Sequence, residues 1–216
     1  MSENLIELMK DVHQNAVSHG WWETPRPEYS VRALIVSEWA EALEEARAGR
    51  PMVWHECRDA GRPAGGPTIC EHEEDCPCKV DEHPERCDAY VEKPEGIAIE
   101  LMDGCIRIMD YLGYLEFDEM FFPDMMESAI RRGKILLRGY PEAAKMEPGE
   151  VPVDMVVDIL TDETMKSRGG YGHMAYVHAF CIACAWVAEA GLDPEKLLLT
   201  KHRYNKGRPY KHGKRF

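Results

Sequence analysis

The sequence lacks the marks of a secreted or membrane-spanning chain. Its first residues contain no basic segment followed by a continuous apolar run, so we expect no secretory signal and a cytoplasmic, reducing environment. The longest apolar stretch, residues 174–190, is close to the shortest length that spans a bilayer, but it contains His178 and is rich in alanine and cysteine. That composition is typical of a helix buried inside protein. We therefore expect no membrane partner.

Low-complexity segments are also scarce, which argues against a disordered chain. The 216 residues are 44% hydrophobic and 30% charged, and a chain of this length and composition can bury a substantial core. We predict a single domain over residues 1–216, with an irregular insertion at 51–95 and a basic tail at 201–216.

Basic residues are too few to balance the acidic ones. The chain has 26 Lys and Arg against 39 Asp and Glu, which gives a net charge of −13. Seven of the basic residues lie in the tail at 201–216, which contains no acidic residue. Most of the surface would therefore repel a phosphate backbone, which argues against nucleic acid as a partner. A basic tail beside an acidic body suits instead a small polyanion that is held partly by a metal ion.

Strand-like alternation does not persist anywhere, whereas helical periodicity is frequent. Apolar residues recur at intervals of three and four, as in Leu5, Leu8 and Val12. The last predicted helix also has a typical start, with Asp193 as N-cap and Pro194 in the first turn. The pattern predicts helices at 2–19, 28–48, 94–114, 123–138, 151–167, 171–190 and 194–205. We therefore predict an all-α helical bundle.

A weak internal repeat is visible in the sequence. Residues 106–118 align with residues 181–193, and each segment precedes a further helix. In this register, Glu100 and Asp103 correspond to Ala175 and His178. The repeat indicates an internal duplication whose second copy has lost its acidic residues and serves as a structural partner.

The insertion at 51–95 holds five of the eight cysteines and three histidines, with little apolar periodicity. A loop of this length needs something to order it, and a structural zinc ion with four Cys or His ligands would do so. The ligands that we predict are Cys70, Cys76, Cys78 and Cys87. The alternatives are a ligand set that includes Cys57, His72 or His83, and an acidic loop with free thiols.

Two predicted helices carry carboxylates where the amphipathic pattern expects apolar side chains. Glu38 and Glu41 are three residues apart on one helix, and Glu100 and Asp103 are three residues apart on another, so each pair projects from one face. Four carboxylates inside a bundle would repel one another and need a cation between them. Oxygen ligands on a rigid frame suit Mg²⁺ or Mn²⁺ better than zinc. The alternative is a solvated acidic face, but the joint placement of the two pairs favours a metal site.

These acidic segments resemble those of a known family. Glu38-Trp39-Ala40-Glu41 and Glu100-Leu101-Met102-Asp103 look like the E-x-x-E and E-x-x-D helices of the MazG-like, all-α nucleoside triphosphate pyrophosphohydrolases. The segment from His13 to Glu23 and the K-x-x-Y-N-x-x-R-P pattern that begins at Lys201 are similar to MazG-like proteins of phages and bacteria.

The resemblance implies a MazG-like helical bundle that binds Mg²⁺ and hydrolyses a ribo- or deoxyribonucleoside triphosphate to the monophosphate and pyrophosphate. It implies a homo-oligomer in the cytoplasm of a bacterium or a phage-infected cell. The implied metal ligands are Glu38, Glu41, Glu100 and Asp103, and the implied nucleotide-binding residues are Lys201, Tyr204, Asn205 and Arg208.

Several assignments within this hypothesis stay open. The general base is one of the four acids or Glu45, and the residue that stacks on the base is Trp21, Trp22 or Tyr204. Arg131, Arg132 and Lys134 are basic residues closer in sequence to the acidic helices than the tail is. A second hypothesis, from another class, is a non-catalytic, zinc-stapled binding or regulatory module whose acids are exposed. The two hypotheses therefore differ in whether the acids converge in the interior.

Overall fold

A computed structural model describes residues 4–56, 93–146, 148–169 and 172–210. The predicted zinc ligands Cys70, Cys76, Cys78 and Cys87 lie outside the described residues, as do their alternatives Cys57, His72 and His83.

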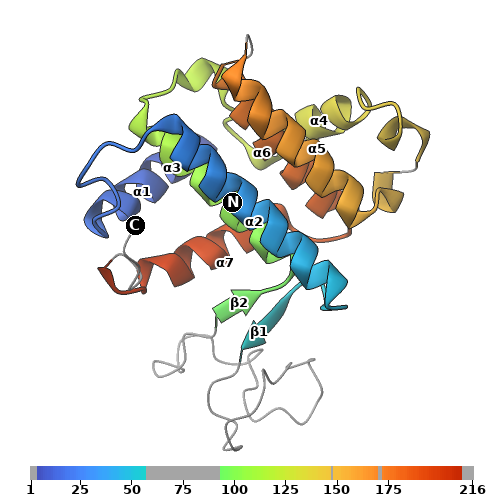
Figure 1. Cartoon of the computed structure of the whole chain (residues 1–216), viewed down its shortest axis with the longest axis horizontal. Coiled ribbons are helices and arrows are strands. Elements are labelled where there is room, and N and C mark those ends of the chain that lie inside the picture. The colour runs from blue at the N-terminus through green and yellow to red at the C-terminus, as the bar shows by residue number, and fades with distance from the viewer. Residues whose placement is uncertain (1–3, 57–92, 147, 170–171, 211–216) are drawn as a thin grey trace, which may run out of the picture.

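The described chain folds into α-helices that match the predicted ones, so the all-α prediction is confirmed (Figure 1). Every helix end lies within three residues of its predicted position. The helices are α1 (Leu5–Ser18), α2 (Glu28–Arg47), α3 (Ile97–Tyr114), α4 (Met126–Leu137), α5 (Val153–Met165), α6 (Met174–Glu189) and α7 (Pro194–Lys206). Short 3₁₀ helices cover Glu119–Phe121, Ala143–Lys145, Pro148–Glu150 and Lys166–Arg168.

Side chains fix the starts of two helices. The Asn4 carboxamide oxygen accepts a hydrogen bond from the backbone N–H of Ile6, which starts α1. The Asp193 carboxylate accepts from the backbone N–H of Lys196, and Pro194 follows it directly, as the sequence predicted for α7.

Helices α3 and α6 form the centre of the molecule. Helix α3 packs against α1, α2, α6 and α7, and helix α6 also packs against α4 and α5. Most residues of both helices are buried, and α6 is apolar on nearly all sides, as is typical of a helix enclosed by others. Within the described parts of the chain, no single helix has the length and apolar composition of a membrane span. In that part of the chain, α6 and α7 taken together have the required length and composition, but the chain bends by 114° between them.

Two short strands, absent from the sequence prediction, join the insertion to the bundle. Strands β1 (Trp54–Glu56) and β2 (Lys93–Glu95) pair antiparallel, with Trp54 opposite Glu95. Gly96 then turns the chain into α3 with φ +109°, and a Cβ there would lie 2.8 Å from the carbonyl oxygen of Met52. This turn places β2 beside the first turn of α3.

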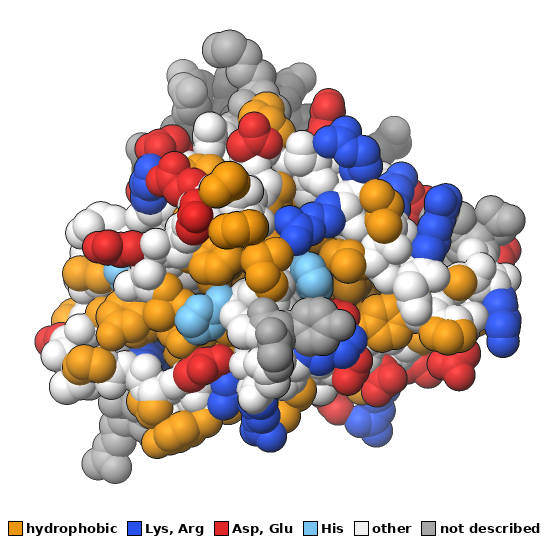
Figure 2. All heavy atoms as spheres, turned by 90° about the horizontal axis from the view of Figure 1, so that it is seen from above, with side chains coloured by type: hydrophobic (Ala, Val, Ile, Leu, Met, Phe, Trp, Pro, Cys, Tyr) orange, Lys and Arg blue, Asp and Glu red, His pale blue; other side chains and the backbone are white. Residues whose placement is uncertain are grey.

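One face of the molecule has hydrophobic side chains at its centre and charged side chains toward its edges (Figure 2). Large hydrophobic side chains that are exposed in the described chain include Met120, Phe121 and Ile135. These three residues border a cavity of about 790 Å³ beside α4.

Candidate metal centre

The acidic segments of α2 and α3 meet where these two helices pack together. One carboxylate oxygen from each of Glu38, Glu100 and Asp103 lies within 4.8 Å of the others. The three residues are buried, with 5%, 3% and 6% of their surface exposed. The structure therefore brings three of the four predicted acids together in the interior, so these three do not form a solvated face.

The close packing of α2 on α3 depends on Gly104. A Cβ at this position would overlap the ring of Trp39, which is fully buried. Trp39 follows Glu38 in α2, and Gly104 follows Asp103 in α3, so this contact sets the separation of the two acidic segments.

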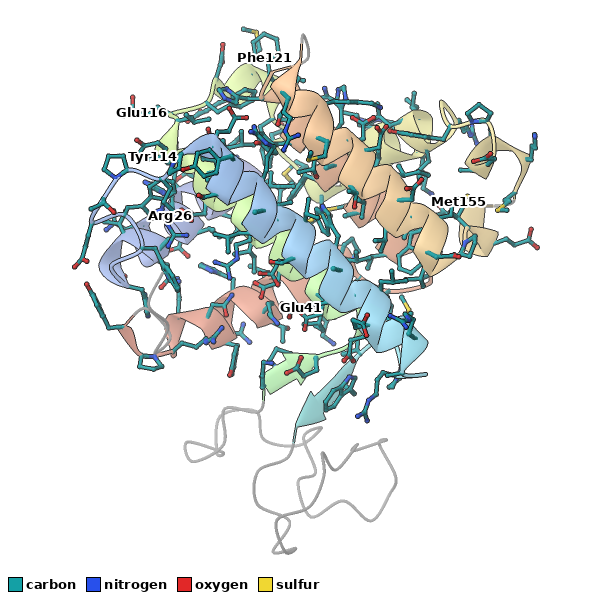
Figure 3. The ribbon with its side chains drawn as sticks, in the orientation of Figure 1. Arg26, Glu41, Tyr114, Glu116, Phe121 and Met155 are labelled. Carbon is teal, nitrogen blue, oxygen red and sulfur yellow. The ribbon has the colours of Figure 1, made fainter. Side chains whose placement is uncertain are left out.

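Glu41 lies at the edge of this group rather than inside it. It is exposed, one helical turn beyond Glu38, and it is not among the three residues whose ligand atoms converge. Figure 3 shows Glu41 on α2 above strand β2. Its charge contributes to the raised pKa of Glu38. Its predicted role as a fourth ligand stays a prediction.

Helix α7 brings the start of the basic tail to the three acids. The ammonium of Lys201, which is 2% exposed, lies 3.4 Å from Glu100 Oε1 and 3.4 Å from Asp103 Oδ2. The Asn205 side chain donates a hydrogen bond to Asp103 Oδ1 at 3.2 Å. Asn205 Oδ1 is buried and has no hydrogen-bond partner among the described residues. Two of the four predicted nucleotide-binding residues are therefore at the acidic centre.

The other predicted basic residues lie elsewhere. The Arg208 guanidinium stands over the ring of Tyr204 at 5.8 Å, at the end of α7. Arg131, Arg132 and Lys134 belong to α4, where Arg132 donates to the carbonyl of Phe121 and Lys134 pairs with Glu189. Of these predicted basic residues, Lys201 of the tail lies beside the acids, and those of α4 do not.

Two residues of the centre were missed by the sequence analysis. Arg107 donates from Nε to Glu38 Oε1 at 3.1 Å, and its place one turn after Asp103 on the same helix face could have revealed it. Glu95 of β2 forms a side-chain hydrogen bond with Glu100. No signal pointed to Glu95, because β2 was not predicted.

Burial and mutual repulsion keep protons on this centre. Burial, with the nearby charge of Asp103, raises the pKa of Glu38 to about 7. Burial raises the pKa of Glu100 to about 9, against the opposing charge of Lys201. Burial also disfavours the charge of Asp103, but Lys201, Arg107 and the hydrogen bond from Asn205 hold the pKa of Asp103 below its ordinary value. A divalent cation would have to displace protons from Glu38 and Glu100 near neutral pH.

Aromatic residues lie beside the centre at the N-terminal end of α2. Trp22 stacks on Tyr114 with ring centroids 4.1 Å apart, and its Nε1 donates to Asp110. Trp21 is buried beneath the guanidinium of Arg26, 4.8 Å from the ring centroid. Figure 3 shows Arg26 and Tyr114 at this end of the helix.

Trp21 borders two cavities. One, of about 30 Å³, is also lined by Asp103, Arg107 and Asn205. The other, of about 570 Å³, extends along α2 past Arg26 to Ser37, the residue before Glu38. The larger cavity is therefore lined by the segment that precedes α2 and by one face of α2, and the three acids are not among its lining residues.

Comparisons with protein-family models, with curated proteins and with solved structures gave no match. The functional argument therefore rests on the geometry of the centre. An all-carboxylate, buried donor set can hold a divalent cation, and oxygen donors favour a hard one over zinc.

Proposed function

We propose that this chain is a Mg²⁺-dependent nucleoside triphosphate pyrophosphohydrolase, which converts a ribo- or deoxyribonucleoside triphosphate and water to the monophosphate and pyrophosphate. One observation carries the proposal: three buried carboxylates from two helices converge with Lys201 and Asn205 of the tail. Such a centre combines cation ligands with an ammonium that can bind phosphate.

The residues present fit a hard divalent cation. Three carboxylates supply oxygen ligands, and Asn205 Oδ1 is a buried acceptor available to a cation-bound water. When bound, Mg²⁺ would neutralise the triphosphate and lower the pKa of a bound water that attacks phosphorus. Mn²⁺ would suit the same ligands.

The chain's own cations would act on the phosphates. Lys201 at present lies against Glu100 and neutralises the charge of Asp103. Once a divalent cation takes over that neutralisation, the ammonium becomes available to a phosphate oxygen. Arg107 keeps Glu38 in place through its hydrogen bond. Glu45 accepts a hydrogen bond from Trp54 Nε1 at 2.6 Å, so it holds β1 and is a poorer candidate for the general base.

We place the nucleoside in the cavity of about 570 Å³ that reaches Ser37, the residue before Glu38 in α2. Its volume is in the range of small-molecule sites. The Arg26 guanidinium uses Nε to donate to the carbonyl of Trp21 at 3.1 Å, and its remaining N–H groups can donate to a base. We also propose a homo-oligomer and a structural zinc ion in the insertion, both on the sequence alone.

The test is release of pyrophosphate by purified protein with Mg²⁺ against a panel of ribo- and deoxyribonucleoside triphosphates. We expect release from some nucleotides, and at least a 100-fold loss in Glu38→Gln and Asp103→Asn. Glu44→Gln is the matched control, because Glu44 is an exposed acid of the same helix. No release from any triphosphate by folded, Mg²⁺-loaded protein would overturn the proposal and favour the binding module.

A further inference from the structure

The two halves of the bundle share a pattern of buried residues. Five of the six buried positions of α1 recur in α4 at a constant spacing of 121 residues; the sixth, Ile6, corresponds to the exposed Glu127. The five in α1 are Leu5, Leu8, Met9, Val12 and Ala16, and those in α4 are Met126, Ala129, the partly buried Ile130, Gly133 and Leu137.

Helices α2 and α5 correspond in the same way, at a spacing of 125 residues. The buried residues of α2 are Val31, Ile35, Glu38, Trp39 and Ala42, and their counterparts Val156, Leu160, Glu163, Thr164 and Ser167 are all buried. Helix α5 also buries Val157 and Ile159. For α3 and α6, the sequence repeat already gives a spacing of 75 residues. Three helices in each half therefore correspond in order, and two of the three pairs bury most of the same positions.

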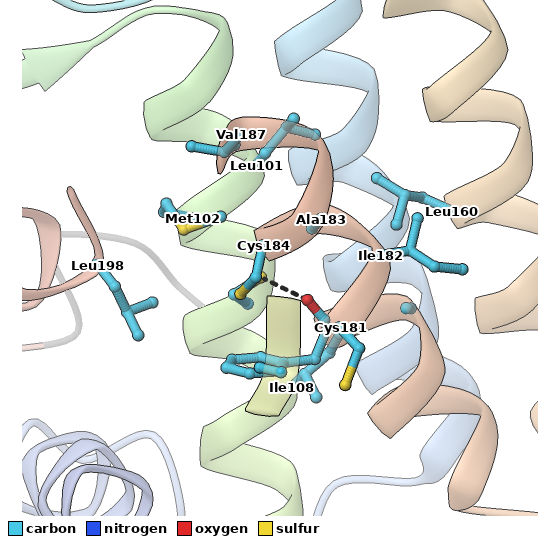
Figure 4. Close-up of a cluster of buried hydrophobic side chains, with 14 of the residues drawn as sticks. Leu101, Met102, Ile108, Leu160, Cys181, Ile182, Ala183, Cys184, Val187 and Leu198 are labelled. Atoms are coloured by element: carbon cyan, nitrogen blue, oxygen red, sulfur yellow. Dashed lines mark hydrogen bonds between the residues drawn. The ribbon is translucent and has the colours of Figure 1, made fainter. Parts of the chain in front are cut away.

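Corresponding residues also touch each other across the centre of the molecule. Trp39 Nε1 donates to Thr164 Oγ1 at 3.1 Å, and these two residues are equivalent in α2 and α5. Cys105 Sγ lies 4.0 Å from the carbonyl oxygen of Phe180, its equivalent in α6, a contact drawn as the dashed line in Figure 4. Contacts between equivalent positions arise where a two-fold axis passes between two copies of one unit.

The positions equivalent to the four acids form a second cluster. Glu38 corresponds to Glu163, Glu41 to Lys166, Asp103 to His178 and Glu100 to Ala175. Glu163 Oε1 lies 2.7 Å from the Lys166 ammonium, and Glu163 Oε2 lies 3.5 Å from His178 Nδ1. Tyr140 also donates to Glu163. The cluster keeps one buried acid, Glu163, which is 5% exposed, and surrounds it with cationic and hydroxyl groups.

We propose that the Glu163 cluster is a second copy of the acidic centre, in which the Lys166 ammonium takes the place of a divalent cation. One acid of the copy is retained, one is replaced by this fixed cation, and the other two positions hold His178 and Ala175. Of the two copies, only the one around Glu38 would then bind a divalent cation, and α4–α6 would serve as its structural counterpart. The inference takes the proposed metal centre as its template. Its own consequence is that restoring three carboxylates should create a second divalent-cation site around Glu163.

The test is the number of Mn²⁺ ions bound by the full chain that carries Lys166→Glu, Ala175→Glu and His178→Asp together. Electron paramagnetic resonance of free Mn²⁺ during titration gives this number. We expect one ion more per chain than in the unchanged protein, and we expect Glu163→Gln added to the three substitutions to remove it. The neutral set Lys166→Gln, Ala175→Gln and His178→Asn is the matched control and should bind no extra ion.

A folded triple variant that binds no extra Mn²⁺, or an extra ion that survives Glu163→Gln, would overturn the inference. If the triple variant does not fold, the single variants decide. Added Mn²⁺ should raise the melting temperature of Lys166→Glu more than that of Lys166→Gln, and equal shifts would overturn the inference. If the proposed centre of Glu38, Glu100 and Asp103 binds no metal, the result is different. The unchanged protein then binds no Mn²⁺, and the triple variant still gains one ion.

Discussion

The ammonium of Lys201 lies 3.4 Å from a carboxylate oxygen of Glu100, although 101 positions separate the two residues in the chain. Both are buried, so the ammonium and the carboxyl group share one site away from bulk water. Helix α7 therefore completes the centre that α2 and α3 begin.

Replacing Lys201 by methionine should weaken both stability and activity. The change leaves the charged carboxylate of Asp103 buried without the Lys201 ammonium, and breaking a buried pair from one side typically costs about 3–5 kcal/mol. We expect a loss of this size in urea unfolding of the metal-free protein, a smaller loss with Mg²⁺, and pyrophosphate release at least 100-fold slower. Lys196→Met on the exposed side of α7 is the control. Equal effects of the two substitutions would contradict this role of Lys201.

The stability of the metal-free protein should fall as pH rises from 5 to 9. The pKa values of Glu38 and Glu100 are raised from 4.5 to about 7 and about 9 in the folded protein. The folded state therefore holds more protons than the unfolded chain across this range, and it loses stability as they leave. Urea unfolding with a chelator present at several pH values measures this. In Glu100→Gln the slope should shrink, and a slope equal to that of the unchanged protein would contradict the prediction.

Glu163 should have the opposite pH dependence. Burial opposes its charge, but hydrogen bonds from His178, Lys166 and Tyr140 lower the pKa of Glu163 to about 2. Its contribution is therefore present above its ordinary pKa of 4.5 and is lost as pH falls toward 2. Glu163→Gln should cost about 3 kcal/mol at pH 7 and progressively less below pH 4.5.

The neighbouring Asp162 provides the control for that measurement. It also pairs with Lys166, at 2.9 Å, but its side chain is 55% exposed. Asp162→Asn should therefore change the free energy of unfolding by less than about 1 kcal/mol. If Glu163→Gln lowers the free energy of unfolding no more than Asp162→Asn does, the buried charge of Glu163 does not stabilise its cluster.

Gly104→Ala should separate α2 from α3. The added methyl group would overlap the ring of Trp39, and overpacking of this kind costs about 1–3 kcal/mol. We expect a lower melting temperature together with weaker Mg²⁺ binding, because Glu38 and Asp103 flank the contact. Gly207→Ala, where a Cβ would make an ordinary 3.5 Å contact with the carbonyl of Tyr204, should change neither. Unchanged Mg²⁺ affinity in Gly104→Ala would show that the contact between Gly104 and Trp39 does not determine the geometry of the metal centre.

Much of the fold could be predicted because the spacing of apolar residues shows which face of a helix is buried. The i, i+3 spacing of Glu100 and Asp103 placed both on one face of α3, and the periodicity of α2 placed Glu38 on its apolar face. The structure brings these faces together. The proximity of Lys201 followed only from a family resemblance, because sequence spacing does not state where α7 packs. Strand β2 was missed because three residues are too few to show alternation, and Glu95 was missed with it.

The most direct test of the metal centre is binding of Mn²⁺, followed by electron paramagnetic resonance, with and without a non-hydrolysable nucleoside triphosphate analogue. The account predicts that the protein binds Mn²⁺, that the analogue tightens this binding, and that Glu38→Gln and Asp103→Asn each weaken it at least tenfold while Glu44→Gln leaves it unchanged. Binding that neither Glu38→Gln nor Asp103→Asn weakens would contradict the account.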